Sequence, residues 1–213
     1  WLFDESQNVT FVESVAAYPG LYYNSPTVQQ PGILGRQSTQ FNGTTQYADT
    51  ENPSNTEWPF SLTFSGFSVT IWVYPTSSGT LTGIIDKGGV TREWAIRHGS
   101  TGVVVAQFQT STGQNMGQVI STIPLPLNQW TNITVTFAGT DGADPVLLYF
   151  DGVDVTQITE AGGGGYAQNV TPISFGQTYT SGGLLYFQGR LDEAATFKAV
   201  LTPAEVLQIY TLG

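Results

Sequence analysis

Carboxylate pairs are the residues of this sequence that could perform hydrolytic chemistry. Glycoside hydrolysis needs two carboxylates flanking the scissile bond, about 5–9.5 Å apart. One candidate pair is Asp151 and Asp154, which flank an Asp-Gly turn and are predicted to point to opposite faces. The other pair is Asp192 and Glu193, which are adjacent in the sequence. Neighbouring residues of a strand point to opposite faces of a sheet, so the second pair is predicted to be divided between two faces. We therefore expect no catalytic residue and no enzymatic activity.

Nucleophilic and zinc-assisted catalysis lack their usual residues. The chain has no cysteine, its only histidine is His98, and no Gly-x-Ser-x-Gly segment occurs. These absences exclude disulfides, thiolate metal sites and a zinc site built from several imidazoles. We interpret His98 as a residue of a strand end or loop. The glycine run at residues 162–165 precedes no helix pattern and predicts a flexible loop rather than a phosphate cradle.

The charge balance narrows the possible partners. Six Lys and Arg stand against sixteen Asp and Glu, giving a formal net charge of -10. Such a surface repels phosphate backbones and anionic lipids, so we expect no nucleic-acid partner. Cations, neutral glycans and protein surfaces remain as possible partners. No apolar run approaches about 18 residues, so no membrane insertion is expected, and a start at Trp1 suggests a processed chain or an excised domain.

Exposed aromatic rings are the residues that a glycan site needs, because they stack on the apolar face of a sugar while amides and carboxylates bind its hydroxyls. Aromatic residues in loop-like settings are therefore the predicted glycan-binding set: Tyr18, Tyr22, Tyr23, Trp58, Tyr166 and Tyr179. By contrast, Trp72, Trp94 and Trp130 fall on strands or at a strand start and are interpreted as core or sheet-face residues.

Short strands must position these side chains. Residues 67–75 alternate between two faces, and residues 82–97 and 103–123 each read as a pair of strands around a turn. Asp151-Gly152 between two apolar runs predicts a two-residue type I′ hairpin.

The C-terminal part supplies a closing strand and one helix. Residues 187–197 predict a strand with Leu191, Ala195 and Phe197 on one face. Beyond it, Thr202-Pro203-Ala204-Glu205 forms a capping box with proline at the first helical position. About a dozen short strands and one late helix predict an all-β, antiparallel two-sheet sandwich.

Several motifs also carry a family resemblance. They include Phe67-Ser-Val-Thr-Ile-Trp-Val-Tyr-Pro75, Trp130-Thr-Asn-Ile-Thr-Val-Thr136, Leu148-Tyr-Phe-Asp-Gly152 and Phe187-Gln-Gly-Arg-Leu-Asp-Glu193. Together they resemble the laminin G-like, pentraxin-like and concanavalin A-like jelly-roll superfamily from Phe41 onward. The resemblance implies one jelly-roll domain over residues 1–213 with a short C-terminal helix. It also implies binding of glycans or proteins, often with calcium, and less often polysaccharide hydrolysis.

Calcium is the cofactor that this resemblance favours, because such jelly rolls often tie the N-terminal segment to the final strand through a structural ion. Here the ion would draw on Asp4 or Glu5, Asn42 and Asp192, since calcium prefers carboxylate, amide and carbonyl oxygens. The alternative is that Asp192 hydrogen-bonds a turn while Asp4 or Glu5 is solvated.

Four Asn-x-Thr sequons occur, at Asn8, Asn42, Asn132 and Asn169. If the chain is secreted by a eukaryote or displayed by a virus, Asn169 after the glycine loop is the leading glycosylation candidate, followed by Asn8 and Asn42. Asn132 lies in a strand pattern and would first have to prove exposed.

The sequence as a whole predicts a non-enzymatic recognition module located outside the cell, at the cell surface or on a virion. It would bind a glycan or a cell-surface protein through loop residues. One alternative is a structural subunit or decoration protein that self-assembles into a filament, capsid or surface layer. A polysaccharide hydrolase or lyase is the minority alternative.

Overall fold

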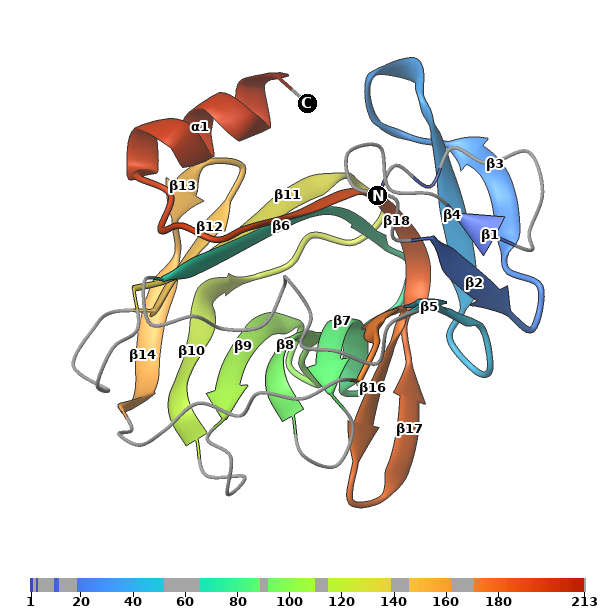
Figure 1. Cartoon of the computed structure of the whole chain (residues 1–213), viewed down its shortest axis with the longest axis horizontal. Helices are drawn as coiled ribbons and strands as arrows, with labels where there is room; N and C mark the ends of the chain where they lie inside the picture. Colours follow the sequence, from blue (N-terminus) through green and yellow to red (C-terminus); the bar gives the residue numbers. More distant parts are fainter. Residues whose placement is uncertain are drawn as a thin grey trace.

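Two β-sheets packed face to face form the body of the protein, with one helix on the outside (Figure 1). The computed structural model describes residues 1, 3, 10–11, 19–51, 66–88, 92–109, 115–138, 146–161 and 171–212. Within these residues no helix is long and apolar enough to cross a membrane. The all-β, two-sheet sandwich expected from the sequence is confirmed.

The larger sheet has eleven strands, in the order β1-β2-β5-β15-β7-β8-β9-β10-β14, with the β16–β17 hairpin joined to β7. Its pairings are antiparallel apart from one parallel bridge between Tyr186 and Gly83. The bounds are β1 (Thr10–Phe11), β2 (Gly20–Tyr23), β5 (Tyr47–Thr50), β7 (Thr82–Gly88), β8 (Arg92–His98), β9 (Val103–Gln109), β10 (Asn115–Pro124), β14 (Thr156–Ala161), β15 (Ile173–Phe175), β16 (Gln177–Thr180) and β17 (Gly183–Tyr186).

The smaller sheet has seven strands in the order β13-β12-β11-β6-β18-β4-β3. Its bounds are β3 (Thr27–Pro31), β4 (Gln37–Asn42), β6 (Phe67–Pro75), β11 (Thr131–Phe137), β12 (Val146–Phe150), β13 (Val153–Asp154) and β18 (Gln188–Phe197). A 3₁₀ turn, η1 (Ile33–Gly35), joins β3 to β4, and helix α1 (Pro203–Leu212) covers part of the outer face of this sheet (Figure 1).

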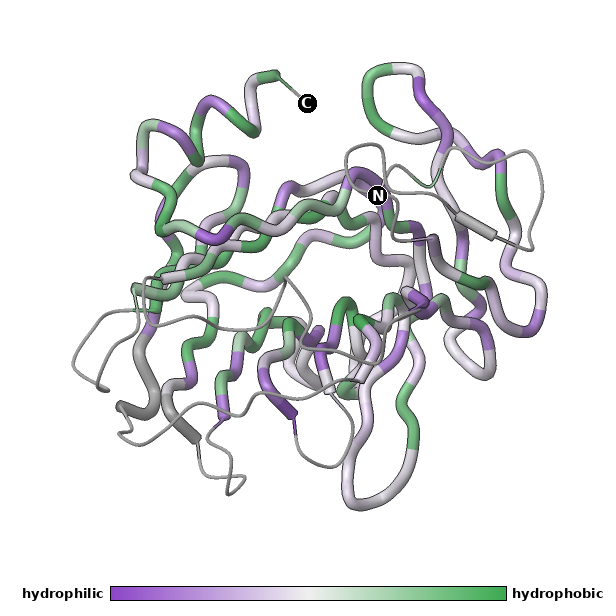
Figure 2. Tube along the Cα trace, in the orientation of Figure 1, coloured by the Kyte–Doolittle hydropathy of each residue, from purple (hydrophilic) through white to green (hydrophobic). Residues whose placement is uncertain are grey.

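The core lies between the inner faces of the two sheets, where the strands carry mainly apolar side chains (Figure 2). Phe67 of the smaller sheet meets Trp94 of the larger sheet, with ring centroids 5.2 Å apart. Phe108 and Phe137 stack across the same interface at 4.5 Å. This apolar interior fixes the register of both sheets, because a slip of one residue would turn each strand's apolar side chains outward.

Two local predictions are confirmed. Phe150 and Val153 pair across a two-residue turn, and both Asp151 and Gly152 have positive φ (51° and 79°), as a type I′ hairpin requires. At the start of α1, the Thr202 N–H donates to Glu205 Oε2 at 2.7 Å, and the Glu205 N–H donates to Thr202 Oγ1 at 3.3 Å.

The predicted parity of the closing strand is wrong beyond Asp192. Asp192 pairs with Trp72 and Ala195 with Thr70, so β18 contains one extra residue there. Glu193 takes up this bulge with a positive φ of 47°. Ala194 therefore faces the core beside Leu191 while Ala195 turns away. The bulge also brings both carboxylates to the η1 turn, where Asp192 accepts the Ile33 N–H and Glu193 pairs with Arg36.

Candidate functional site: a polar pocket on the larger sheet

A row of polar residues crosses the outer face of the larger sheet. The strand register places Asp49, Ser174, Asp86, Ala95, Gln107 and Gln118 next to one another on β5, β15, β7, β8, β9 and β10. Their strand neighbours, such as Ala48 and Ile96, point into the core, so alternation directs this row away from it. The small Ala95 leaves space in the middle of the row.

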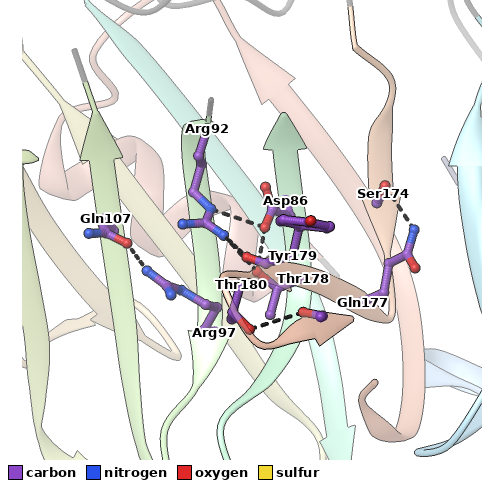
Figure 3. Close-up of polar contacts among 10 residues, drawn as sticks. Asp86, Arg92, Arg97, Gln107, Ser174, Gln177, Thr178, Tyr179 and Thr180 are labelled. Carbon is purple, nitrogen blue, oxygen red and sulfur yellow. Dashed lines mark hydrogen bonds and ion pairs between the residues drawn. The ribbon is translucent and has the colours of Figure 1, made fainter. Parts of the chain in front are cut away.

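Charged side chains gather around Asp86 in that space (Figure 3). Arg92 Nε lies 3.1 Å from Asp86 Oδ2, and its Nη2 donates to Thr178 Oγ1 at 3.2 Å. The Thr178 hydroxyl donates to the same Asp86 oxygen, and Arg92 also donates to the Tyr179 carbonyl. Alongside, Arg97 donates to Gln107 Oε1. Asp86, Arg92 and Thr178 are all buried, so the pair is shielded from screening by salt.

The β16–β17 hairpin forms the wall beside this cluster. Its first residues cross directly over Gly83, where a Cβ would lie 2.1 Å from the backbone carbon of Gln177. Only glycine permits this close approach. At the tip, Thr180 Oγ1 donates to the Gly183 carbonyl at 3.0 Å and closes the turn (Figure 3). The hairpin is thereby held against β7.

A pocket of about 200 Å³ opens between the hairpin and strands β7 and β15. We call it the Asp86 pocket; it is lined by Asp86, Gly88, Thr171, Pro172, Ser174, Gln177, Thr178, Tyr179 and Leu184. Tyr179 and Leu184, a cross-strand pair of the hairpin, form its exposed rim. Two of the lining residues carry buried acceptors, Asp86 Oδ1 and Gln177 Oε1, that have no hydrogen-bond partner among the described residues.

Burial changes the proton affinity of both carboxylates of the row. It raises the pKa of Asp49 from 3.8 to about 6, against the opposing effect of hydrogen bonds from Ser174 and Gln177. Those bonds reach Asp49 Oδ1 at 2.5 Å and 3.3 Å. Burial also raises the pKa of Asp86, while Arg92 and the Thr178 hydroxyl act against the rise. Burial lowers the pKa of Arg97 to about 10, so its guanidinium stays charged at neutral pH.

The three predicted glycan-binding aromatics that the structure describes lie in three different settings. Tyr179 lies at the rim of the Asp86 pocket. Tyr23 stacks on Tyr47 with ring centroids 4.5 Å apart, and Tyr47 contacts Tyr186 at 6.3 Å. Tyr47 and Asp49 are two residues apart on β5, so both side chains point to the same side of the larger sheet. The rings of Tyr23 and Tyr47 therefore lie on its outer face.

The predicted loop position is wrong for Tyr23 of β2 and Tyr179 of β16, which lie on strands. It is also wrong for Tyr22. This residue belongs to β2, only 8% of its surface is exposed, and its hydroxyl hydrogen-bonds Thr39 at 2.9 Å inside the sandwich. Alternation along β2 turns it inward because Tyr23 turns outward. Tyr18, Trp58 and Tyr166 lie outside the described residues.

Asn42 and Asp192, the described residues among those expected to share a calcium ion, are not brought together. Asn42 pairs with Gln188 on β18, four residues before Asp192, which separates the two side chains by about 13 Å along the strand. Asn42 Oδ1 accepts the backbone N–H groups of residues 44–46 at 2.9–3.2 Å. In the part of the chain that the structure describes, no three His, Asp or Glu side chains are grouped to hold a metal. Asp4 and Glu5 lie outside that part.

The sequons differ in accessibility. Asn42 is exposed and remains a glycosylation candidate, whereas Asn132 is buried and hydrogen-bonded to Thr70 beneath α1. Asn8 and Asn169 lie outside the described residues.

His98 and the Asp86 cluster show what sequence reasoning could and could not locate. His98 is the last residue of β8, as expected, and burial lowers its pKa. Asp49, Arg92 and Gln177 were not predicted as site residues. Alternating parity could have placed Asp86 outward, but only the strand order brings β5, β15 and β16 beside it.

Comparison with known proteins identifies the family. A model described as "Concanavalin A-like lectin/glucanases superfamily" matches residues 42–207. The chain belongs to this superfamily. No curated protein matches the chain in sequence.

Solved structures show the same fold at low sequence identity. Domain 4 of AbnA, a GH43 extracellular arabinanase from Geobacillus stearothermophilus in complex with arabinotriose, aligns with a TM-score of 0.70 and 19% identity, over 99% of this chain and 96% of that domain. The botulinum neurotoxin serotype G binding domain aligns at 0.68 and 13% identity, over 94% of this chain and 48% of its own length. Trypanosoma rangeli sialidase aligns with a TM-score of 0.69 and 11% identity, over 98% of this chain and 31% of the sialidase. The concanavalin A-like fold of the sandwich is thereby established.

Proposed function

We propose that this chain is a non-enzymatic glycan-recognition module that binds a saccharide in the Asp86 pocket. The observation that carries the proposal is the pair of buried acceptors, Asp86 Oδ1 and Gln177 Oε1, which have no partner among the described residues and line the same pocket. A buried polar atom without a hydrogen bond is costly. Sugar hydroxyls are donors that would satisfy both atoms once the lining side chains move aside, because both atoms are buried in the free protein.

The rim of the pocket supports the same ligand class. Tyr179 and Leu184 are 37% and 43% exposed and stand beside the acceptors. An aromatic ring next to hydrogen-bonding groups matches a sugar, which has an apolar ring face and a polar edge. The tyrosines at positions 23, 47 and 186 extend the aromatic surface along the same sheet face. An oligosaccharide that runs from the pocket toward these rings is the ligand we favour.

The relatives are consistent with a neutral ligand and an external location. The similar arabinanase domain is in complex with arabinotriose, and its enzyme is extracellular. A net charge of -10 also disfavours anionic ligands at a pocket whose cations are already paired. We therefore propose that the module works outside the cell and that the Asp86 pocket binds neutral saccharides.

The contacts of the two buried carboxylates, Asp86 and Asp49, support binding without catalysis. Arg92 and Thr178 both bind Asp86 Oδ2, which gives that oxygen a structural role. Asp49 has the raised pKa of a general acid, yet Ser174 and Gln177 bind its carboxylate and it does not line the pocket.

A glycan array, with and without a calcium chelator, followed by calorimetry with arabinotriose and the best array ligand, tests the proposal. Tyr179→Ala is expected to weaken binding by about tenfold through loss of one aromatic contact. Val153→Ala changes an exposed residue of the other sheet and is the matched control. Failure of every glycan in both conditions, or release of reducing ends from polysaccharides, would contradict the proposal.

A further inference from the structure

A second hollow lies on the other side of the molecule, on the outer face of the seven-stranded sheet. Its volume is about 500 Å³, within the range of about 300–1,000 Å³ typical of ligand sites. Trp72 and Trp130 line its floor, residues 210–211 of α1 form one wall, and residues 32–34 of the η1 turn form the other. In Figure 1, α1 and the loop joining β3 to β4 rise from the same side of this sheet. We call this hollow the aromatic groove.

The rings of the aromatic groove are held in place by one another. Trp72 and Tyr210 lie with ring centroids 5.7 Å apart, and Tyr74 meets Trp130 edge to face at 5.5 Å. The Arg190 guanidinium carbon lies 3.8 Å from the Tyr74 ring centre and 5.4 Å from that of Trp130. Such packing fixes the side chains before any ligand arrives, which reduces the entropy lost on binding.

The turn that forms the opposite wall is anchored to the floor. Asp192 Oδ2 accepts the Ile33 N–H at 3.1 Å and lies so near Gly32 that a Cβ there would be 2.4 Å away. The neighbouring Glu193 holds Arg36 at 3.1 Å. The bulge in β18 thus ties both ends of the turn to the sheet, so the wall has a fixed position.

Leu34 at the edge of this wall is unusual. It adopts a left-handed conformation (φ 47°, ψ 29°), which is unfavourable for a leucine, and its side chain is 74% exposed. Figure 2 shows the hydrophobic tip of this loop projecting from the sheet. Unfavourable backbone held in place by its surroundings is concentrated at ligand-binding sites.

Few cations lie near the surface of this protein, whose net charge is -10. Lys87, Arg92 and Arg97 are buried in the larger sheet, which leaves Arg36, Arg190 and Lys198 nearer the surface. Arg36 follows the η1 turn and is paired with Glu193, whereas Arg190 lies against Trp130, which lines the aromatic groove. Arg190 Nη1 donates to the Pro31 carbonyl at 2.6 Å, and no carboxylate of the described residues forms an ion pair with it.

We propose that the aromatic groove binds a sugar ring that carries an anionic group, either a carboxylate or a sulfate. The indole and phenol rings stack on the apolar face of the sugar, and the Arg190 guanidinium forms a charge-assisted hydrogen bond with the anion. This site is separate from the Asp86 pocket, which lies on the outer face of the other sheet, and its argument does not depend on that pocket.

Three ligands test the chemistry by calorimetry on the whole chain. They are a uronic-acid oligosaccharide, its uncharged methyl ester, and a sulfated neutral oligosaccharide. We expect at least one of the two anionic ligands to bind, and which of them binds identifies the anion. If the uronic acid binds, equal affinity of its methyl ester would overturn the proposal, and so would no binding by either anionic ligand.

Variants then assign the site. Arg190→Gln is expected to weaken binding by about tenfold or more, the effect of losing a hydrogen bond to a charged group. Lys198→Gln removes the same charge just after β18, about 25 Å away along the strand direction, and should leave the affinity unchanged. Tyr210→Ala on the exposed helix should weaken binding about fivefold, while Tyr179→Ala in the Asp86 pocket should not.

Thermal melts accompany each variant. Equal losses in Arg190→Gln and Lys198→Gln would show a diffuse charge effect and refute the site. Unchanged affinity in a folded Tyr210→Ala variant would also refute it. The two proposals can fail separately. Loss of anionic-ligand binding with intact glycan binding at the Asp86 pocket would overturn only this one, and the reverse result would overturn only the first.

Discussion

Replacing Asp49 with asparagine should stabilise the protein at neutral pH. In the native structure Asp49 Oδ1 accepts hydrogen bonds from Ser174 and Gln177, and the amide oxygen of asparagine can accept both. What the substitution removes is the cost of holding a buried negative charge near Asp86. The hydrogen bonds and the size of the side chain are kept, so the effect of the charge is isolated.

The magnitude follows from the pKa of Asp49, which is 3.8 in its ordinary state and about 6 in the folded protein. At about 1.36 kcal/mol per pKa unit, this rise corresponds to about 3 kcal/mol. The folded state binds more protons than the unfolded state between these values, so Asp49 makes stability fall as pH rises from about 4 to about 6. Above that window the destabilisation is complete, and below it there is none.

Urea denaturation followed by tryptophan fluorescence at several pH values measures this effect. We expect the free energies of unfolding of wild type and Asp49→Asn to coincide near pH 4 and to diverge to about 3 kcal/mol above pH 6, with the variant more stable. Glu51→Gln removes an exposed charge two residues away and is the control. If the wild-type and Asp49→Asn curves ran parallel at all pH values, the assignment of a raised pKa to Asp49 would be refuted.

Three further substitutions test how the structure is held together. Asp86→Ala should lower the free energy of unfolding by about 3–5 kcal/mol in urea denaturation, because Arg92 stays buried without its carboxylate; a change below about 1 kcal/mol would show that the pair is solvated. Gly83→Ala places a Cβ 2.1 Å from the Gln177 backbone, so hydrogen exchange should accelerate in β16, and unchanged protection would contradict the close crossing. Thr202→Ala should cost about 1 kcal/mol in thermal unfolding and Thr202→Ser much less; equal losses would argue against a cap.

Features set by neighbouring residues could be predicted from the sequence. The Asp151-Gly152 hairpin and the Thr202 capping box depend on fewer than six consecutive residues each, and both formed as expected. The Glu193 bulge was missed, because it depends on how β18 fits against β6. A strand read alone has no partner against which an extra residue would be visible.

The candidate site was harder to predict because its residues meet only through strand order. Asp86 on β7 precedes Ser174 on β15 and Gln177 on β16 by about 90 residues, yet the three are adjacent in space. The aromatic groove combines β6, α1 and the η1 turn in the same way. Trp72 was correctly interpreted as a sheet-face residue, but nothing local indicates that a helix and a turn leave a space beside it.

The position of β18 has a consequence for how the chain folds. Residues 188–197 are among the last in the sequence, yet they fill the gap between β6 and β4 in the middle of the smaller sheet. Until they arrive, both neighbours have an unpaired edge, and such edges promote association between chains. Contacts this distant in sequence slow folding. During synthesis, this sheet therefore stays incomplete and prone to aggregation until its last strand leaves the ribosome.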